Sequence, residues 1–288
     1  GNGGSSVVGA YQLNTGPEFA EPVIGWSAGE WGEGAWGIGG SNTEALRLWS
    51  QTNFGEDLVF GPRGGGVYYW DATTGITVRA QLVSDAFSST ASNVPVVQNR
   101  ILVSDISRFV FCLGTNPLGS TTLDPMLIRW ADQESVSNWT PAASNQAGDL
   151  RLSNGSEIIT ATQARQEVLV WTDSALYSLQ YVGAPAVWGA QLVGENTSTA
   201  SQNCVAYANG VAYWMGKDKF YKYDGRTQPL RCDIRRYIFN DFNSLQYDQV
   251  FAGTNESFHE IWWFYCSSDS QTANRYAVYN YQEDIWYY

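Results

Sequence analysis

One pattern occurs five times along this chain: an apolar strand, a short polar or glycine-containing turn, and then an aromatic strand. In the fullest copy, residues 46–71, a first strand is followed by a second over 57–60, a Gly/Pro turn over 61–66 and an aromatic third strand over 67–70. Each run is short, rich in β-branched and aromatic residues, and bounded by Gly, Pro, Asn or Asp. Three such strands in so short a segment predict an antiparallel meander.

The spacing of the copies predicts the architecture. Aligning Tyr69, Val110, Tyr177, Tyr221 and Ala277 places successive copies 41, 67, 44 and 56 residues apart. Repeats of about 40–50 residues, each a small antiparallel sheet, are typical of β-propeller blades, and longer intervals accommodate loop insertions. We therefore predict an all-β fold, a β-propeller of five or six antiparallel blades forming a single domain.

The later copies have less distinct boundaries. The second is predicted to continue through a strand at 123–132 to a Trp-containing turn at 139–141. The third is predicted over 144–193, the fourth over 204–230 and the fifth over 249–288.

The N-terminal residues 1–45 differ in kind from the propeller domain predicted for 46–288. They are dense in glycine, and Trp26, Trp31 and Trp36 recur every five residues with no helical or strand period. We interpret this segment as an extended arm whose tryptophans dock either on its own domain or on a neighbouring subunit, since Trp is favoured as an interface anchor.

One short inserted helix is predicted after Asp233, interpreted as its N-cap. Apolar residues from Ile234 to Leu245 fall at helical spacing and define one face, which leaves Arg235 and Arg236 pointing elsewhere.

The chain stops inside an aromatic strand, residues 284–288. A bare apolar strand is an aggregation hazard unless it is paired. Two interpretations stay open: this strand closes the ring against an N-terminal strand such as 45–49, or the chain is a piece of a longer one.

The chain is acidic, with 16 Lys and Arg against 28 Asp and Glu and a formal net charge of −12. This balance excludes a protein whose whole surface grips nucleic acid, because phosphate binding needs clustered cations. It permits a protein past which DNA slides without adhering.

The basic residues are unevenly distributed. Seven of the 16 lie between positions 217 and 236: Lys217, Lys219, Lys222, Arg226, Arg231, Arg235 and Arg236. The cluster is either a solvated blade edge or a contact with an acidic neighbour, such as the next copy of this same protein; DNA is a less favoured partner.

No catalytic, cofactor or metal site is predicted. The single histidine, His259, has no second histidine at helical spacing, so the zincin arrangement is absent, and no Gly-x-Ser-x-Gly elbow accompanies it. The glycine-rich segment 61–66 leads into a strand rather than a helix N-terminus, so we interpret it as a hairpin turn and not a phosphate cradle. A pair of carboxylates converging from different blades for glycoside hydrolysis stays open.

Cysteine spacing and hydropathy bear on the compartment. Cys112, Cys204, Cys232 and Cys266 form no Cys-x-x-Cys pair and are predicted to be buried free thiols, in keeping with assembly in a reducing cytoplasm. No apolar run approaches the roughly 18 residues of a membrane span, and no signal peptide pattern opens the sequence. We predict no membrane insertion.

Residues 46–58, together with 63–71, resemble the tail hub or nozzle proteins of short-tailed double-stranded DNA phages, also called packaged-DNA stabilisation proteins or tail tubular protein B. Further segments resemble the same family: 128–134 with 138–141, 155–158, 165–173 with 175–183, 213–216 with 220–225, and 280–288. The similarity is spread over most of residues 24–288 and concerns the fold and family, not a catalytic motif.

The resemblance implies a β-propeller in a hexameric tube below the portal and adaptor rings. Through such a tube the genome leaves the virion, and tail fibres or a plug assemble on it. Known members are often longer, with further β domains.

The expected function is therefore that of a non-enzymatic structural protein of the virion tail, assembled in the host cytoplasm, which retains and ejects the genome. Expected partners are further copies of the chain in a hexamer, the portal and adaptor ring proteins, and the tail fibre and plug proteins; double-stranded DNA passes without specific binding. The candidate subunit-interface residues are Trp26, Trp31, Trp36, Lys217, Lys219, Lys222, Arg235 and Arg236.

Two alternatives remain. The first is a glycan-binding or glycan-cleaving propeller module of a phage tail, because exposed Trp and Tyr rings stack on sugar faces. The second is a propeller scaffold for unrelated partners, which fold alone does not distinguish.

If the basic cluster contacts an acidic copy of the chain, the double substitution Arg235→Glu and Arg236→Glu weakens self-assembly, because like charges then face each other. Sedimentation at low and high salt measures this effect. Unchanged assembly of the charge-reversed protein would remove the proposed role of the cluster.

Overall fold

The computed structural model describes residues 16–20, 46–105 and 107–288. The chain divides into two compact units, residues 1–47 and 48–288. The three tryptophans of the predicted arm, Trp26, Trp31 and Trp36, lie outside the described residues. All twenty described strands belong to the 48–288 unit.

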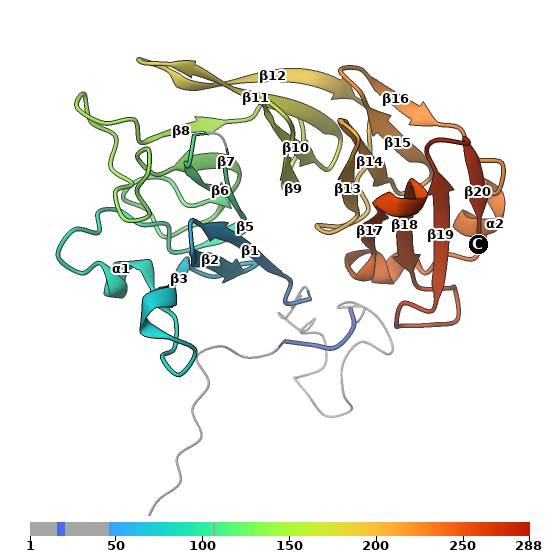
Figure 1. The fold of residues 1–288 in the computed structure, drawn as a ribbon, viewed down its shortest axis with the longest axis horizontal. Helices are drawn as coiled ribbons and strands as arrows, with labels where there is room; N and C mark the ends of the chain where they lie inside the picture. The colour runs from blue at the N-terminus through green and yellow to red at the C-terminus, as the bar shows by residue number, and fades with distance from the viewer. Residues whose placement is uncertain (1–15, 21–45, 106) are drawn as a thin grey trace, which may run out of the picture. The chain divides into compact units, whose positions relative to one another are not determined.

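This unit is a five-bladed β-propeller, in which each blade is a four-stranded antiparallel meander whose strands pair in chain order (Figure 1). Blade 1 contains β1 (Trp49–Phe54), β2 (Asp57–Pro62), β3 (Tyr68–Trp70) and β4 (Gln81–Leu82); blade 2 contains β5 (Gln98–Val103), β6 (Val110–Thr115), β7 (Asp124–Trp130) and β8 (Gly148–Arg151); blade 3 contains β9 (Ile158–Gln163), β10 (Val168–Thr172), β11 (Ala175–Gly183) and β12 (Val187–Glu195); blade 4 contains β13 (Val205–Ala208), β14 (Val211–Met215), β15 (Phe220–Tyr223) and β16 (Thr227–Leu230); blade 5 contains β17 (Phe251–Asn255), β18 (Glu260–Tyr265), β19 (Arg275–Asn280) and β20 (Ile285–Tyr287). The prediction of an all-β propeller is confirmed, with the blade number fixed at five.

The helices in the described part of the chain are short. They are α1 (Val83–Ala86), α2 (Arg235–Asn240) and the 3₁₀ helices η1 (Ala72–Thr74), η2 (Ser244–Gln249) and η3 (Glu256–Phe258). They lie within or between blades and leave the sheet stacking uninterrupted (Figure 1).

The alignment of the five repeated copies was wrong for the second blade by one strand position. The aromatic strand around Val110 is β6, the second strand of its blade, whereas Tyr69 lies in the third strand of blade 1. The segment after Ser144 supplies β8, which completes blade 2, so the third blade begins only at Ile158. The error has a physical reason: a run of large apolar residues marks a strand that is buried on both faces, not its position in the meander.

The predicted helix is real but shorter than its apolar pattern. Helix α2 begins after Ile234, which makes no side-chain cap, and Asp233 instead pairs with Arg231 at 3.3 Å. Ile238 is buried, whereas Leu245 belongs to η2 and is exposed. The N-cap prediction for Asp233 was therefore wrong.

The predicted ring closure through the last strand was also wrong. Strand β20 pairs with β19 of its own blade, and β1 pairs with β2. Because every blade is completed by consecutive strands, no strand among the described residues is left over to join the first and last blades.

Neighbouring blades are held together by three hydrophobic clusters of buried residues. One joins blade 1 to blade 2, a second joins blade 2 to blade 3, and the largest spans blades 3, 4 and 5. None of the clusters in the described residues joins blade 5 to blade 1. Those two blades are linked instead by an ion pair between Arg63, which follows β2, and Asp248 in η2. The shorter of its two contacts, from Nη2 of Arg63 to Oδ2 of Asp248, is 2.6 Å.

Large aromatic rings fill the contact between blades 4 and 5. Trp263 on β18 is fully buried, and its ring centroid lies 4.8 Å from that of Phe220 and 5.8 Å from that of Trp286. Its indole Nε1–H donates to the carbonyl oxygen of Cys204 at 2.9 Å. This side chain therefore joins two blades through packing and through a satisfied buried hydrogen bond.

Trp263→Ala is expected to lower the free energy of unfolding by about 3–5 kcal/mol, because it removes a buried aromatic ring and leaves a cavity. Urea unfolding followed by circular dichroism measures the loss. Ile76→Ala, at a side chain that is 92% exposed, serves as the control and should change the free energy of unfolding by at most about 0.5 kcal/mol. A loss no larger than the control's would show that this contact does not stabilise the unit.

Candidate functional site

A groove lies over blades 3 and 4, on the side where three turns meet. The turn between β9 and β10 (residues 164–167) forms one wall, and the turns between β13 and β14 and between β15 and β16 form the other. One part of the groove has a volume of about 300 Å³. A second part, on the side of Asp105 and Asn209, has about 510 Å³.

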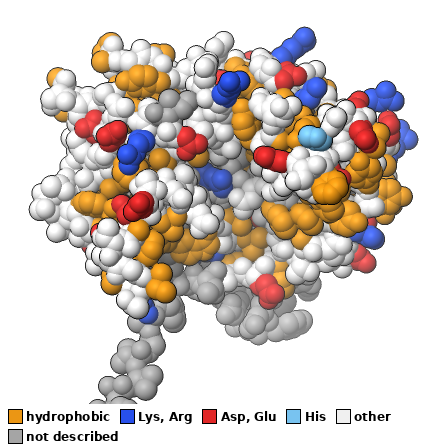
Figure 2. All heavy atoms as spheres, in the orientation of Figure 1, with side chains coloured by type: hydrophobic (Ala, Val, Ile, Leu, Met, Phe, Trp, Pro, Cys, Tyr) orange, Lys and Arg blue, Asp and Glu red, His pale blue; other side chains and the backbone are white. Residues whose placement is uncertain are grey.

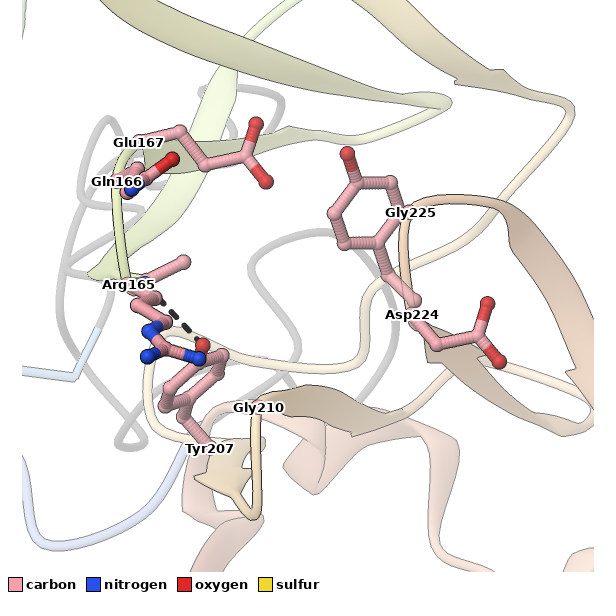
Figure 3. A pocket seen from close by; sticks show the side chains of 9 residues that line it. Arg165, Gln166, Glu167, Tyr207, Gly210, Asp224 and Gly225 are labelled. Carbon is pink, nitrogen blue, oxygen red and sulfur yellow. Dashed lines mark hydrogen bonds between the residues drawn. The ribbon is translucent and has the colours of Figure 1, made fainter.

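The groove walls are polar and aromatic. In Figure 3 the Glu167 side chain and the Asp224–Gly225 turn lie on opposite sides of the hollow, and the backbone N–H of Arg165 donates to the hydroxyl of Tyr207 at 3.1 Å. That bond fixes the 164–167 turn against blade 4. The groove thus depends on the packing of two blades, not on one loop alone.

Glu167, in the turn between β9 and β10, lines the groove. It accepts a hydrogen bond from the hydroxyl of Ser178, a buried residue of β11 in the same blade. This neutral donor holds the carboxylate in place.

Tyr223 is affected by this neighbour. Burial raises the pKa of its hydroxyl to about 12, with further contributions from the negative charges of Glu167 and Asp224. The phenol therefore stays protonated at neutral pH.

A smaller cavity of about 70 Å³ lies on the other side of the same turn, between blades 2 and 3. Its lining residues are Ser104, Ser107, Gln163, Gln166, Glu167, Tyr181 and Trp188. Gln166 and Glu167 line both this cavity and the groove. The two hollows therefore share one wall.

Two of the lining residues carry buried polar atoms with no hydrogen-bond partner: Oε1 of Gln163 and Nε1 of Trp188. They are two of nine such atoms in the described residues, and leaving a buried donor or acceptor unsatisfied costs about 1–3 kcal/mol. A donor and an acceptor are thus both unsatisfied in residues around one cavity. Sequence reasoning missed this cavity, because nothing in the sequence brings 104–107, 163–167 and 181–188 together.

The described residues contain no group of three His, Cys, Asp or Glu side chains arranged to hold a metal ion. His259 lies in blade 5, where its Nδ1 is 3.3 Å from the hydroxyl of Tyr281, and is not among the groove's lining residues. The four cysteines are free; Cys112, Cys204 and Cys266 are buried, whereas Cys232 is only partly so.

The predicted basic cluster does not form one surface. Lys217 and Lys219 lie at the turn between β14 and β15, whereas Arg226 lies at the turn between β15 and β16, at the opposite end of the strands. Arg235 and Arg236 are exposed on α2. On the face seen in Figure 2, basic and acidic side chains are interspersed.

Several of these cations have local partners. Lys219 lies 3.6 Å from Asp218, and Lys222 lies 3.8 Å from Asp224. Lys217 lies over the ring of Tyr247. The positive charge of these lysines is therefore partly neutralised by neighbouring carboxylates. Their role at a subunit interface stays a prediction.

The two end blades carry aromatic faces that the sequence analysis did not single out. Along β18, Ile261, Trp263 and Tyr265 are buried towards blade 4, so by strand alternation Trp262 and Phe264 point to the opposite face. We define the blade 5 aromatic face as Phe251, Trp262, Phe264 and Tyr276.

These four rings contact one another but are incompletely covered. The centroids of Phe251 and Phe264 are 4.7 Å apart, and those of Trp262 and Tyr276 are 5.2 Å apart. Phe251 remains 44% exposed and Tyr276 43% exposed. The sequence could have predicted this face from the run Trp262-Trp263-Phe264-Tyr265. Aromatic residues at consecutive positions of a strand point alternately to its two sides, so both faces of the strand are apolar.

Blade 1 has a matching feature. Ser50 and Val59 point towards blade 2, so Trp49, Phe60 and Tyr68 lie on the face away from it. We define these three residues as the blade 1 aromatic face. Their ring centroids are 6.1 Å (Trp49 to Phe60) and 5.7 Å (Phe60 to Tyr68) apart, and Trp49 is 45% exposed.

Comparisons with known proteins give the fold and no more. No family model and no curated protein matches the chain. Among solved structures it is similar to Kluyveromyces lactis Hsv2, with a TM-score of 0.43 and 8% identity over 83% of this chain and 61% of that one. It is also similar to the AfRom2 CNH domain (TM-score 0.46, 10% identity, 84% of each chain) and to the extracellular domain of a hybrid two-component system from B. thetaiotaomicron (0.47, 16%, 77% of this chain and 26% of that one).

The chain spans about 61% of the Hsv2 chain, and likenesses at these TM-scores carry no argument about activity, ligand or partner. Among the described residues, no helix has the length and apolar character needed to cross a membrane. The class of protein defined here is the β-propeller.

The raised pKa of Tyr223 predicts a pH dependence of stability. In the unfolded chain the phenol ionises near pH 10, whereas in the fold its pKa is about 12. Its contribution to the free energy of unfolding is therefore fully present below about pH 10 and is lost as pH rises towards 12.

Tyr223→Phe should make the fall in the free energy of unfolding between about pH 9 and about pH 11.5 less steep, measured by urea unfolding at each pH. The fall should not vanish, because burial also raises the pKa of Tyr213 and of Tyr265 to about 12. A slope equal to that of the unsubstituted protein would contradict the burial argument for Tyr223.

Proposed function

We propose that this chain is a non-enzymatic structural subunit of a phage tail hub or nozzle, which assembles with further copies into a ring through which the genome is retained and ejected. Its location is then the virion tail, after assembly in the host cytoplasm. The observation that carries the proposal is the pair of aromatic faces on blades 1 and 5.

Stacked blades normally cover each other's apolar faces, as the three clusters from blade 1 through blade 5 do. The blade 1 and blade 5 aromatic faces receive no such cover from a cluster in the described residues. Phe251, Tyr276 and Trp49 thus leave large rings in contact with solvent. Exposed aromatic groups of this kind mark protein interaction sites, and Tyr, Trp and Phe are enriched in interface cores.

The residues that carry the resemblance lie in the blades. Segment 128–134 includes the end of β7, segment 165–173 includes β10, and segment 213–216 lies in and after β14. Trp171 and Trp214, in the latter two, are fully buried. The resemblance therefore concerns the propeller itself, and the portal, adaptor, fibre and plug partners are proposed from it.

The acidity fits this role. A chain with 28 acidic and 16 basic residues repels the phosphate backbone at the ionic strength of a cell, at short range. DNA that leaves through a ring of such subunits would pass without adhering. Double-stranded DNA is then a passing substrate and not a ligand.

The double substitution Phe251→Ser and Tyr276→Ser is expected to weaken self-association at least tenfold, because it removes two exposed rings from the blade 5 aromatic face without disturbing the face buried on blade 4. Native mass spectrometry and light scattering over a concentration series measure the oligomer fraction.

Leu118→Ser, at a 48% exposed side chain in the loop between β6 and β7, is the matched control and should associate like the unsubstituted protein. Near-UV circular dichroism checks that each variant is folded. The proposal fails if the unsubstituted protein stays monomeric at all concentrations, or if the double variant assembles equally well.

A further inference from the structure

We infer that the blade 5 aromatic face is the docking site for the tryptophan-rich segment of a neighbouring copy, residues 21–45. This inference rests on the proposed assembly and names the contact that makes it, in which the segment of one copy lies on blade 5 of the next. Trp26, Trp31 and Trp36 supply the anchoring rings. The segment itself lies outside the described residues.

The blade 5 aromatic face contains an opening over one glycine. Gly253 lies between Phe251 and Asn255 along β17 and pairs with Trp262 on β18. A methyl group at Gly253 would have no heavy atom of a non-adjacent residue within 4 Å, and the φ angle of this glycine is not positive. We call this opening the Gly253 notch. A glycine inside a strand often marks the place where another group approaches the backbone closely.

The side chains beside the notch present apolar surface. The rings of Phe251 and Phe264 stack with their centroids 4.7 Å apart. The indole Nε1–H of Trp262 donates to Oε2 of Glu260 at 3.0 Å, and the same oxygen accepts from Nδ2 of Asn255 at 3.3 Å. The polar groups of this side of blade 5 thus pair with each other. An aromatic ring that enters the notch meets other rings, an arrangement that stabilises contacts beyond the area buried.

The area of the face argues for an extended segment as its occupant. Phe251 is 44% exposed and Tyr276 43% exposed, and the other two rings are less exposed. An aromatic side chain buries at most about 250 Å², so the four rings offer no more than about 400 Å². A stable interface takes about 800 Å² from each partner. A flat contact with this face alone is therefore too small, whereas an extended segment adds contacts along its own length.

The sequence of residues 21–45 has the composition of such an occupant. Its three tryptophans lie five residues apart and are separated by small residues and glutamates. Trp is among the residues most favoured as interface anchors, and residues 1–15, which also lie outside the described part, contain none. Fully extended, 25 residues span about 85 Å, which is far enough to reach a neighbouring copy.

The charge of the segment makes the contact apolar in origin. Residues 21–45 contain four Glu and no Lys or Arg, and the whole chain has a net charge of −12. Electrostatic repulsion between copies therefore opposes docking, and salt weakens this repulsion by screening. Association through the Gly253 notch should strengthen with salt. A contact made by the basic cluster would instead weaken with salt.

The test uses two full-length variants, each lacking one half of the contact. The triple substitution Trp26→Ser, Trp31→Ser and Trp36→Ser removes the anchors and keeps the face. Gly253→Gln fills the notch with a polar side chain and keeps the segment. Each variant alone should self-associate at least tenfold more weakly than the unsubstituted protein, measured by light scattering and native mass spectrometry.

Thr254→Gln is the matched control. Thr254 is the next residue of β17, is exposed, and points to the other side of the strand, so this variant should associate like the unsubstituted protein. Near-UV circular dichroism checks that each variant is folded. If Gly253→Gln is not folded, the double substitution Phe251→Ser and Tyr276→Ser takes its place as the variant with an altered face.

An equimolar mixture of the two impaired variants should form one-to-one pairs, because the segment of the Gly253→Gln copy docks on the intact face of the triple variant. Native mass spectrometry distinguishes the two copies by mass. Sedimentation should show at least twice as much pairing at about 0.5 M salt as at about 0.05 M, since screening reduces the repulsion.

Four results would overturn the inference. If the unsubstituted protein assembles and the two variants assemble equally well, the proposed function stands and the contact lies elsewhere. Impaired variants whose mixture forms no pairs would show that the segment docks on its own copy. Pairs that weaken as salt rises would show a charged contact. An unsubstituted protein that stays monomeric at all concentrations would overturn the proposed function together with this inference.

Discussion

The packing of large aromatic side chains between neighbouring sheets is the interaction on which this structure depends. A four-stranded meander has two faces and cannot bury either by itself, so each blade is stable only against its neighbours. Trp171, Trp214 and Trp263 occupy these contacts from blade 3 to blade 5, each fully buried. The three hydrophobic clusters are the result of this single requirement repeated around the ring.

The same requirement singles out the two ends of the series. Blade 1 and blade 5 each bury one face on a neighbour, and their other faces carry rings that remain partly exposed, such as Trp49 and Phe251. The link between these blades is polar, the Arg63–Asp248 ion pair, with side chains that are 21% and 27% exposed. An ion pair so placed contributes less than a packed aromatic contact would. The ends of the series are therefore the surfaces that the proposed assembly would cover.

The polar hollows over blades 2, 3 and 4 arise from a different consequence of the fold. Turns that follow alternate strands gather at one side of the sheets, so Glu167, Tyr223 and Tyr207 meet although they belong to different blades. Hydrogen bonds between the turns fix this geometry, such as that from Arg165 to Tyr207.

By itself the sequence determined that this chain is built of repeated antiparallel meanders, because strand alternation, turn residues and the repeat interval are local properties. It located the fourth and fifth blades closely. It misplaced β6 and β8, since a fully buried strand has the same apolar residue pattern at any position in a blade. Only the tertiary structure decided which aromatic rings are core and which are exposed: Trp262 and Trp263 are identical in type and adjacent, yet they face opposite sides of one sheet. It alone brought Gln163, Glu167 and Trp188 around one cavity, because contacts between residues distant in the chain follow from how the blades stack and not from any local pattern.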